Sequence, residues 1–156
     1  MGFKFRLESL LKLRKRKEES AQIEYILARK AVDNSSDKIN KMYSEIDHSR
    51  IEIFNHQNSN GQHKEMILHL ESYIEGLKTK IELERNVLRQ LIMEAEEKQF
   101  LLSEASKEFK ILDKLKEKKL NQYKEEILKK ESSEIDELVV LRFKNVEGEE
   151  NSEIKL

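Results

Sequence analysis

The sequence predicts an all-α fold, a long two-helix antiparallel coiled-coil hairpin whose second helix is the longer and ends in a flexible acidic tail. Apolar residues recur every three or four positions in two long series, and one polar stretch separates the series. Proline is absent, so nothing forces a break within either series. Charged residues make up 39% of the 156 residues and mean hydropathy is -0.77, which is too polar for a globule with a thick core. We therefore expect one elongated domain.

The first helix is expected over about residues 5–54, because a heptad repeat runs through it. One strong stripe steps by seven residues and is broken only by Glu18: Leu11, Glu18, Tyr25, Val32, Ile39, Ile46 and Ile53. A companion stripe is smaller and more polar: Leu7, Arg14, Ala21, Ala28, Ser35, Met42 and Ser49. Together the two stripes predict a seam that faces another helix.

A polar segment at about residues 55–63 predicts the turn, since Asn and Gly tolerate the left-handed backbone at a helix end. The second helix is expected over about residues 64–143. Its seam reads Ile67, Leu70, Ile74, Leu77, Ile81, Glu84, Leu88, Leu91, Ala95, Lys98, Leu102, Ala105, Phe109 and Leu112. After Leu112 the register slips by about one position and Leu120, Tyr123 and Ile127 carry the stripe, as in a stutter.

A fold-back around Ser59 to Gly61 sets the predicted pairing of the two helices. It places Ile46 near Ile74, Ile39 near Ile81, Val32 near Leu88, Tyr25 near Ala95 and Leu11 near Phe109. The second helix then outruns the first, because no residue before Leu7 can cover its far end. Residues 144–156, acidic and poor in apolar side chains, are expected to form a flexible tail.

The charges are strongly patterned although the net charge is only -1. Residues 1–17 carry seven Lys and Arg side chains against one acid, Glu8. Residues 131–156 carry eight acids against three bases. One end of the chain is therefore basic and the tail is acidic, a pattern typical of electrostatic partner contacts.

No motif predicts catalysis or a cofactor. Gly-rich phosphate loops are missing, and the abundant carboxylates read as solvated helix faces. His48, His56, His63 and His69 gather around the turn, but without a metal-ligand spacing they are interpreted as polar loop-end residues and not a zinc site. Nucleic acid is not expected as a partner, because aromatic residues do not interleave with the cations.

Two features have two readings each. Residues 3–14 combine apolar and cationic side chains, as a membrane-surface helix does. Leu7 and Leu11 continue the heptad, however, which favours a solvated coiled-coil end. Gly76 lies in mid-helix, where glycine costs about 1 kcal/mol relative to alanine. It is either a tolerated defect or a point where a partner comes close.

The absence of cysteine fits a reducing cytosol.

The order of several short motifs resembles the FliJ family of flagellar export proteins. The start reads Phe3-x-Phe5-x-Leu7-x-x-Leu10-Leu11-x-Leu13-Arg14, followed by Glu18-Glu19-x-Ala21-Gln22. Tyr73-Ile74-x-x-Leu77 follows the turn, and Lys107-x-x-Lys110-x-Leu112-x-Lys114-Leu115-Lys116-Glu117-Lys118 comes later. Glu131, Ile135-Asp136-Glu137 and Arg142-Phe143 close the series. The resemblance covers nearly the whole chain.

The resemblance implies a non-enzymatic component of the flagellar type III protein export apparatus, cytoplasmic and peripheral to the inner membrane at the flagellar base. It implies a central stalk in the pore of the hexameric export ATPase, which also contacts the large membrane subunit of the export gate and escorts substrate chaperones. A generic coiled-coil tether and the equivalent stalk of a virulence-type secretion system are the alternatives.

The resemblance also implies where the partners bind. The basic end supplies the expected ATPase-ring contacts, Lys12, Arg14, Arg16, Lys17, Lys110 and Lys114. Tyr73 and Leu77 match an aromatic-x-x-x-Leu pair on the gate-binding face of enteric-type members. Further along that face, Lys80 and Glu84 stand where the family has small and histidine residues.

Overall fold

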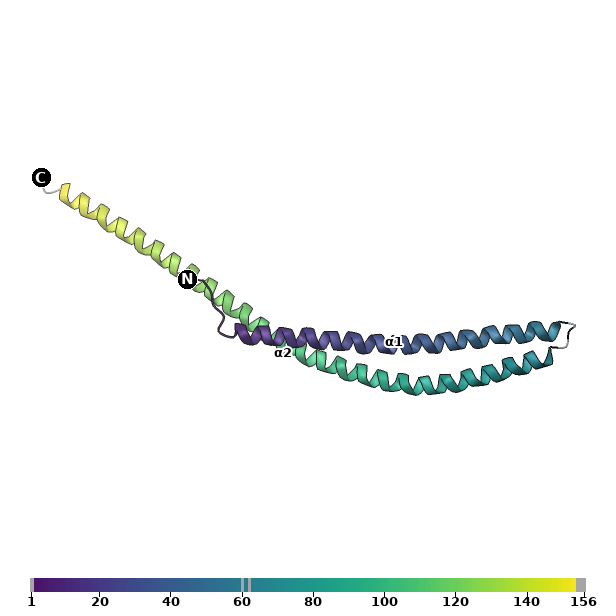
Figure 1. The fold of residues 1–156 in the computed structure, drawn as a ribbon. Helices are drawn as coiled ribbons and strands as arrows, with labels where there is room; N and C mark the ends of the chain where they lie inside the picture. Colours follow the sequence, from purple (N-terminus) through teal and green to yellow (C-terminus); the bar gives the residue numbers. More distant parts are fainter. Residues whose placement is uncertain (1, 60, 62, 154–156) are drawn as a thin grey trace. The chain divides into compact units, whose positions relative to one another are not determined.

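Two α-helices, α1 (Glu8–Asn58) and α2 (Lys64–Glu153), make up the fold (Figure 1). The computed structural model describes residues 2–59, 61 and 63–153, with side chains up to residue 147. Within these ranges there is no strand, and neither helix has a stretch apolar and long enough to cross a membrane. The helices pack against each other and α2 is the longer, so the predicted helical hairpin is confirmed.

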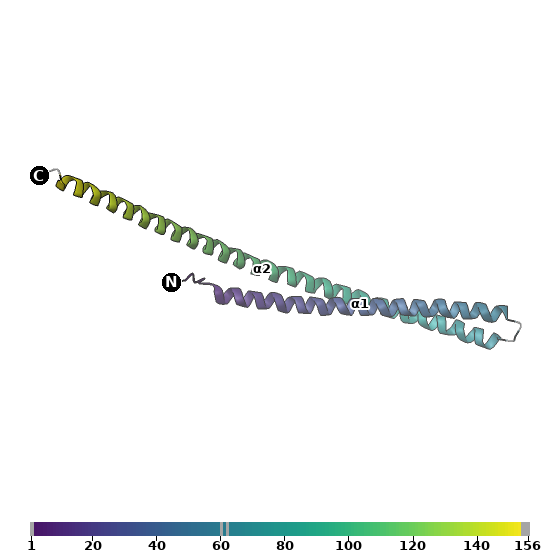
Figure 2. The same ribbon diagram turned by 90° about the horizontal axis from the view of Figure 1, so that it is seen from above.

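The chain divides into two compact units, which are described separately. The hairpin unit contains residues 14–107, and the terminal unit contains residues 1–13 with 108–156. In the hairpin unit α1 runs alongside α2 in the opposite direction, as two perpendicular views show (Figures 1 and 2).

The core of the hairpin unit is the predicted seam. Ile39, Ile46, Ile74, Leu77 and Ile81 form a buried cluster, against which Met42, Ile53 and Leu88 pack. Ile81 is 2% exposed and Ile46 is 3% exposed. Full burial of such a side chain contributes about 1.5–3 kcal/mol, so this single row of contacts holds the two helices together.

Polar contacts across the seam show which residues of the two helices lie opposite each other. Glu45 accepts a hydrogen bond from Tyr73, and Glu24 pairs with Lys98 at 2.9 Å. Each pair joins residues at nearly the same distance from the turn, as the predicted fold-back requires. The cluster likewise brings Ile39 and Ile46 together with Ile81 and Ile74.

The turn differs from the expectation in its backbone. No described residue has a positive φ, Gly61 included, so glycine is not needed there for a left-handed conformation. A Cβ on Gly61 would lie 2.6 Å from Nε2 of His63, so a larger residue there would displace that imidazole. Ser59 Oγ donates to the His56 carbonyl at 3.0 Å and closes the end of α1. Asn60 and Gln62 lie outside the described residues.

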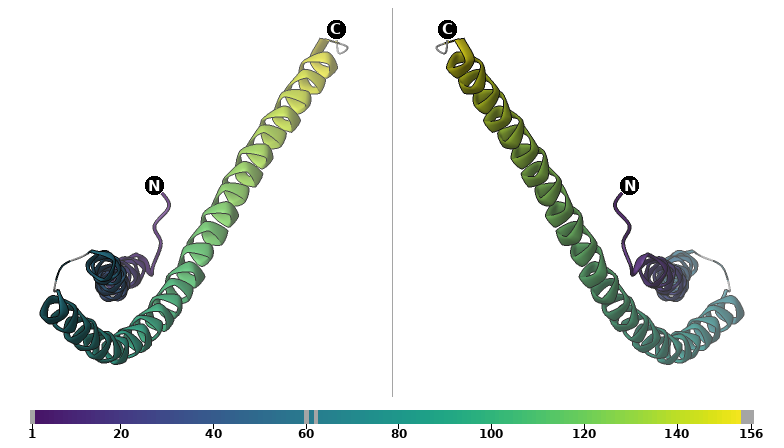
Figure 3. Two further views of the ribbon diagram at one scale, coloured as in Figure 1. Left: turned by 90° about the vertical axis from the view of Figure 1, so that its right-hand side faces the viewer. Right: turned by 90° about the vertical axis from the view of Figure 1, so that its left-hand side faces the viewer.

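The terminal unit joins the start of α1 to α2. Leu11 and Leu112 are buried, at 7% and 6% exposure. Residues 2–7 form a non-helical arm, the purple coil next to the N-terminus in Figure 3. The ring centroid of Phe3 in this arm lies 5.7 Å from that of Tyr123. The predicted stripe through Leu120 and Tyr123 is confirmed, since both are half-buried.

Two expected helix boundaries and one expected seam residue were wrong. The first helix begins at Glu8 and not near residue 5, because Lys4 and Arg6 are unfavourable at the positive end of a helix dipole whereas Glu8 is favourable. Ile127 is 36% exposed and so does not belong to the seam. The second helix continues to Glu153 and does not stop near residue 143, because the segment has no proline and one glycine costs only about 1 kcal/mol. Residues 154–156 of the expected tail lie outside the described residues.

Candidate functional site: a basic end and a helix-spanning groove

The terminal unit presents unpaired cations on both helices. Lys12 lies one residue after the buried Leu11 on α1, and Lys110 and Lys114 lie four residues apart on α2. All three side chains are exposed, and among the described residues none of them forms an ion pair. Two lysines at this helical spacing are neighbours on one face, where their like charges repel. These three exposed lysines therefore have no ion-pair partner among the described residues.

One ion pair in this unit was not predicted. Lys116 Nζ lies 2.8 Å from Glu8 Oε2 and 3.0 Å from Oε1, and both side chains are partly buried. Glu8, the acid within the basic start, thus neutralises one lysine and ties α1 to α2. Lys107, in the hairpin unit, pairs with Glu104 on its own helix at 3.2 Å. Lys110 and Lys114, which form no ion pair among the described residues, are among those that were expected to contact a partner.

The other expected ring contacts, Arg14, Arg16 and Lys17, belong to the hairpin unit. Arg16 and Lys17 are exposed on α1. Arg14 is half-buried, because it occupies the companion stripe of the seam. Its role in a partner contact stays a prediction.

Tyr73 and Leu77, the expected gate contacts, occupy different environments. Tyr73 is 45% exposed and its hydroxyl donates to Glu45 Oε2 at 2.8 Å. This hydrogen bond, followed by desolvation and by repulsion between phenolate and carboxylate, raises the pKa of Tyr73. Leu77 is 4% exposed and belongs to the core cluster. The heptad and the family resemblance suggested different roles for Leu77, and its burial agrees with the heptad. Of this pair, Tyr73 is the residue that offers surface to a partner.

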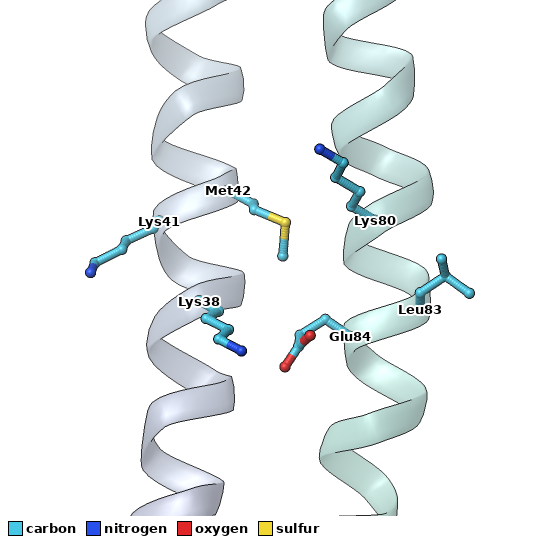
Figure 4. A pocket seen from close by; sticks show the side chains of 6 residues that line it. All are labelled: Lys38, Lys41, Met42, Lys80, Leu83 and Glu84. Atoms are coloured by element: carbon cyan, nitrogen blue, oxygen red, sulfur yellow. The ribbon is translucent and has the colours of Figure 1, made fainter.

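A groove runs between the two helices of the hairpin unit, a short distance from Tyr73 along α2. It has a volume of about 410 Å³ and is lined by Lys38, Lys41, Met42, Lys80, Leu83 and Glu84; we call it the lysine groove. Figure 4 shows Lys38, Met42, Lys80 and Glu84 pointing into the space between the helices, whereas Lys41 and Leu83 point outwards from its two sides. Its lining is mostly apolar, and both helices contribute lysines to it.

The charges of the lysine groove are not balanced within the described part of the chain. None of its three lysines forms an ion pair or hydrogen bond there. Glu84 is engaged by Ser35, whose hydroxyl donates to Oε1 at 2.6 Å. From sequence, Met42 and Glu84 were expected in the seam, and Lys80 and Glu84 as departures from a family pattern. Lys38 and Lys41 were missed, because only the fold places them beside these residues of α2.

The histidines do not gather into a metal site. The ring centroids of His56 and His63 lie 4.9 Å apart with the rings tilted by 49°, and Nε2 of His48 lies 3.5 Å from Oε1 of Glu52. Among the residues that the structure describes, no group of three His, Cys, Asp or Glu side chains could hold a metal ion.

Comparison with known proteins identifies the family. The family model described as flagellar FliJ protein matches residues 3–148, which is nearly the whole chain. No curated protein and no solved structure matched the chain. The match spans both helices, the basic start and the lysine groove. The chain belongs to the FliJ family and is a component of the flagellar protein export apparatus.

Proposed function

We propose that this protein is the non-enzymatic central stalk of the hexameric flagellar export ATPase, that it links the ATPase to the large membrane subunit of the export gate, and that it escorts substrate chaperones. Membership of the FliJ family supports a role within the flagellar protein export apparatus. The observation that carries the stalk role is the set of exposed, unpaired cations on the terminal unit, Lys12, Lys110 and Lys114.

Lys12, Lys110 and Lys114 form no ion pair among the described residues, so a partner protein is expected to supply the opposite charges. Like charges a few ångströms apart repel even in water, so the unpaired cations destabilise the isolated protein. Acidic loops lining a ring pore remove that repulsion and also steer the encounter between the two proteins. The helical hairpin supplies a stiff shaft, because each helix carries its own backbone hydrogen bonds along its length. Binding in a pore therefore favours the assembled ring and raises ATP hydrolysis by the partner.

The experiment titrates the protein into purified export ATPase and measures the ATP hydrolysis rate and the affinity at several salt concentrations. Wild type should stimulate hydrolysis and show no hydrolysis alone. Reversal of Lys12, Lys110 and Lys114 to Glu should weaken binding at least about tenfold and flatten its salt dependence, because screening acts on these charges. Reversal of Arg14, Arg16 and Lys17 tests the hairpin-unit contacts in the same way.

A matched control reverses three exposed cations elsewhere, Lys30, Lys64 and Arg89. This variant has the same net charge as the test variants and should stimulate like wild type. Helicity by circular dichroism should be equal in all variants. Absence of stimulation by wild type at any concentration would leave a generic coiled-coil tether as the better description.

A further inference from the structure

The far part of α2 exposes a large apolar surface. Ile135, Leu138, Val139 and Val146 recur at spacings of three, four and seven and therefore share one face of the helix. They are 60%, 63%, 46% and 55% exposed, respectively. Contiguous apolar surface of this kind marks an interaction site, since water contact with it is unfavourable. Some other apolar surface is thus expected to cover this face.

Acidic side chains flank this apolar face on both sides. Helical spacing places Glu134 beside Leu138 and Asp136 beside Val139 on the opposite flank, whereas Glu131, four residues before Ile135, lies on the apolar face itself. All three acids are exposed. We call residues 131–147 the acidic ridge: an apolar stripe with one of these carboxylates on each side, Glu134 and Asp136. Arg142 also lies on this face.

The lysine groove has the complementary arrangement. Its lining is mostly apolar and includes cations from both helices, Lys38 and Lys41 on α1 and Lys80 on α2. Charged rows on either side of an apolar seam are what set partner and orientation in helical assemblies. Glu84 within the groove offers the opposite charge to Arg142.

We propose that the acidic ridge of one molecule docks in the lysine groove of a second copy of the same chain. The mode is a helix in a groove, with Ile135 and Leu138 placed against Met42, the apolar side chain that points into the groove. Because Lys80 and Glu134 lie on the same helix, α2, the contact is assigned to two different chains. In a dimer with two-fold symmetry the contact forms twice, each copy giving its ridge and its groove.

Sedimentation analysis of the full chain tests the proposal with two reciprocal variants. The groove variant is Lys38→Glu with Lys80→Glu, and the ridge variant is Glu134→Lys with Asp136→Lys. Wild type should dimerise, and dimerisation should weaken as salt rises from about 0.05 to about 0.5 M, because the Debye length shrinks. Each variant alone should dimerise at least about tenfold more weakly, since like charges then face each other in both contacts.

An equimolar mixture of the two variants should regain dimers, because a mixed pair restores opposite charges at both contacts. Substitution of Lys30 and Lys64 by Glu serves as the control and should leave dimerisation unchanged. All substituted side chains are exposed, and circular dichroism checks that helicity is kept. A wild type that stays monomeric, or a mixture that does not recover, would overturn the proposal. A monomeric wild type whose groove variant loses export-gate binding would assign the groove to the gate instead.

Discussion

Ser35 Oγ donates a 2.6 Å hydrogen bond to Glu84 Oε1 across the seam of the hairpin. Ser35 is 3% exposed, and Glu84 occupies a position where the heptad calls for an apolar residue. The hydroxyl therefore makes a carboxylate acceptable inside the seam. A hydrogen bond to a charged group contributes about 1.5–3 kcal/mol to the stability of the folded state. Without this bond, the partly buried carboxylate of Glu84 would lose contact with water and gain no partner in exchange.

Ser35→Ala should lower the free energy of unfolding by about 1–3 kcal/mol, because Glu84 then loses its partner. The double change Ser35→Ala with Glu84→Leu should recover that loss, since the seam becomes apolar at both positions. Urea unfolding followed by circular dichroism measures both. A single variant as stable as wild type would mean that the hydrogen bond is not formed in solution.

Cysteine pairs test the register of the two helices. The chain has no cysteine, so Ile39→Cys with Ile81→Cys, and separately Val32→Cys with Leu88→Cys, give a clean background. Each pair should oxidise within one chain, as shown by faster migration on a non-reducing gel. Ile39→Cys with Leu88→Cys is the mismatched control. Its offset of seven residues, about 10 Å at 1.5 Å per residue, exceeds the reach of a disulfide.

Leu77 and Tyr73 should respond differently to truncation. Leu77→Ala should cost about 2–5 kcal/mol of stability, because it leaves a cavity in the core cluster. Tyr73→Ala removes an exposed side chain and should leave stability nearly unchanged while weakening export-gate binding. Gate binding measured at a temperature where all variants are folded separates the two effects. Equal loss of stability from both changes would contradict the environments described above.

Gly76 lies between these two residues in the chain, and a Cβ there would meet no atom within 4 Å. Gly76→Ala should therefore raise the free energy of unfolding by about 1 kcal/mol, since alanine favours the helix. If glycine serves close approach of a partner, the same variant should bind the export gate more weakly. Thermal unfolding and gate titration on one sample distinguish this role from a tolerated defect.

The Lys98–Glu24 pair predicts how stability changes at alkaline pH. The hydrogen bond and attraction from Glu24 raise the pKa of Lys98 above its ordinary value of 10.5. The unfolded chain therefore releases this proton first, so the contribution is complete below pH 10.5 and is lost as pH rises through the folded pKa. Lys98→Met should show a smaller fall of the unfolding temperature across this range than wild type. Lys30→Met, at an exposed lysine, is the control.

The seam could be predicted from sequence because a heptad repeat is a local pattern with a single structural solution. The stripe from Leu11 to Ile53 and its facing series are buried or half-buried as expected, and the polar Ser35 and Ser49 are among the most buried residues. The register followed from the position of the turn. Ile127 was misplaced because α1 begins at Glu8, which pairs with Lys116, so no residue of α1 lies opposite Ile127, eleven residues further along α2.

The surface sites were less predictable, because they depend on which residues of two helices lie opposite each other. The pairing of Glu8 with Lys116 crosses 108 positions of the chain. The lysine groove combines residues 38–42 with 80–84, and no local motif connects them. The extent of α2 was underestimated because acidic composition was read as disorder, although Glu and Lys are good helix formers.

The tight turn between Asn58 and Lys64 has a consequence for how the molecule forms. Contacts beside the turn close short loops, whereas the Glu8–Lys116 pair closes one that spans 108 positions. Loop closure loses more entropy as the loop grows, but each seam contact shortens the loop left for the next one. We therefore expect folding to nucleate at the turn and to proceed like a zipper towards the termini. The basic end is then the last part to assemble and the first to open, which leaves it free to adapt while the turn stays closed.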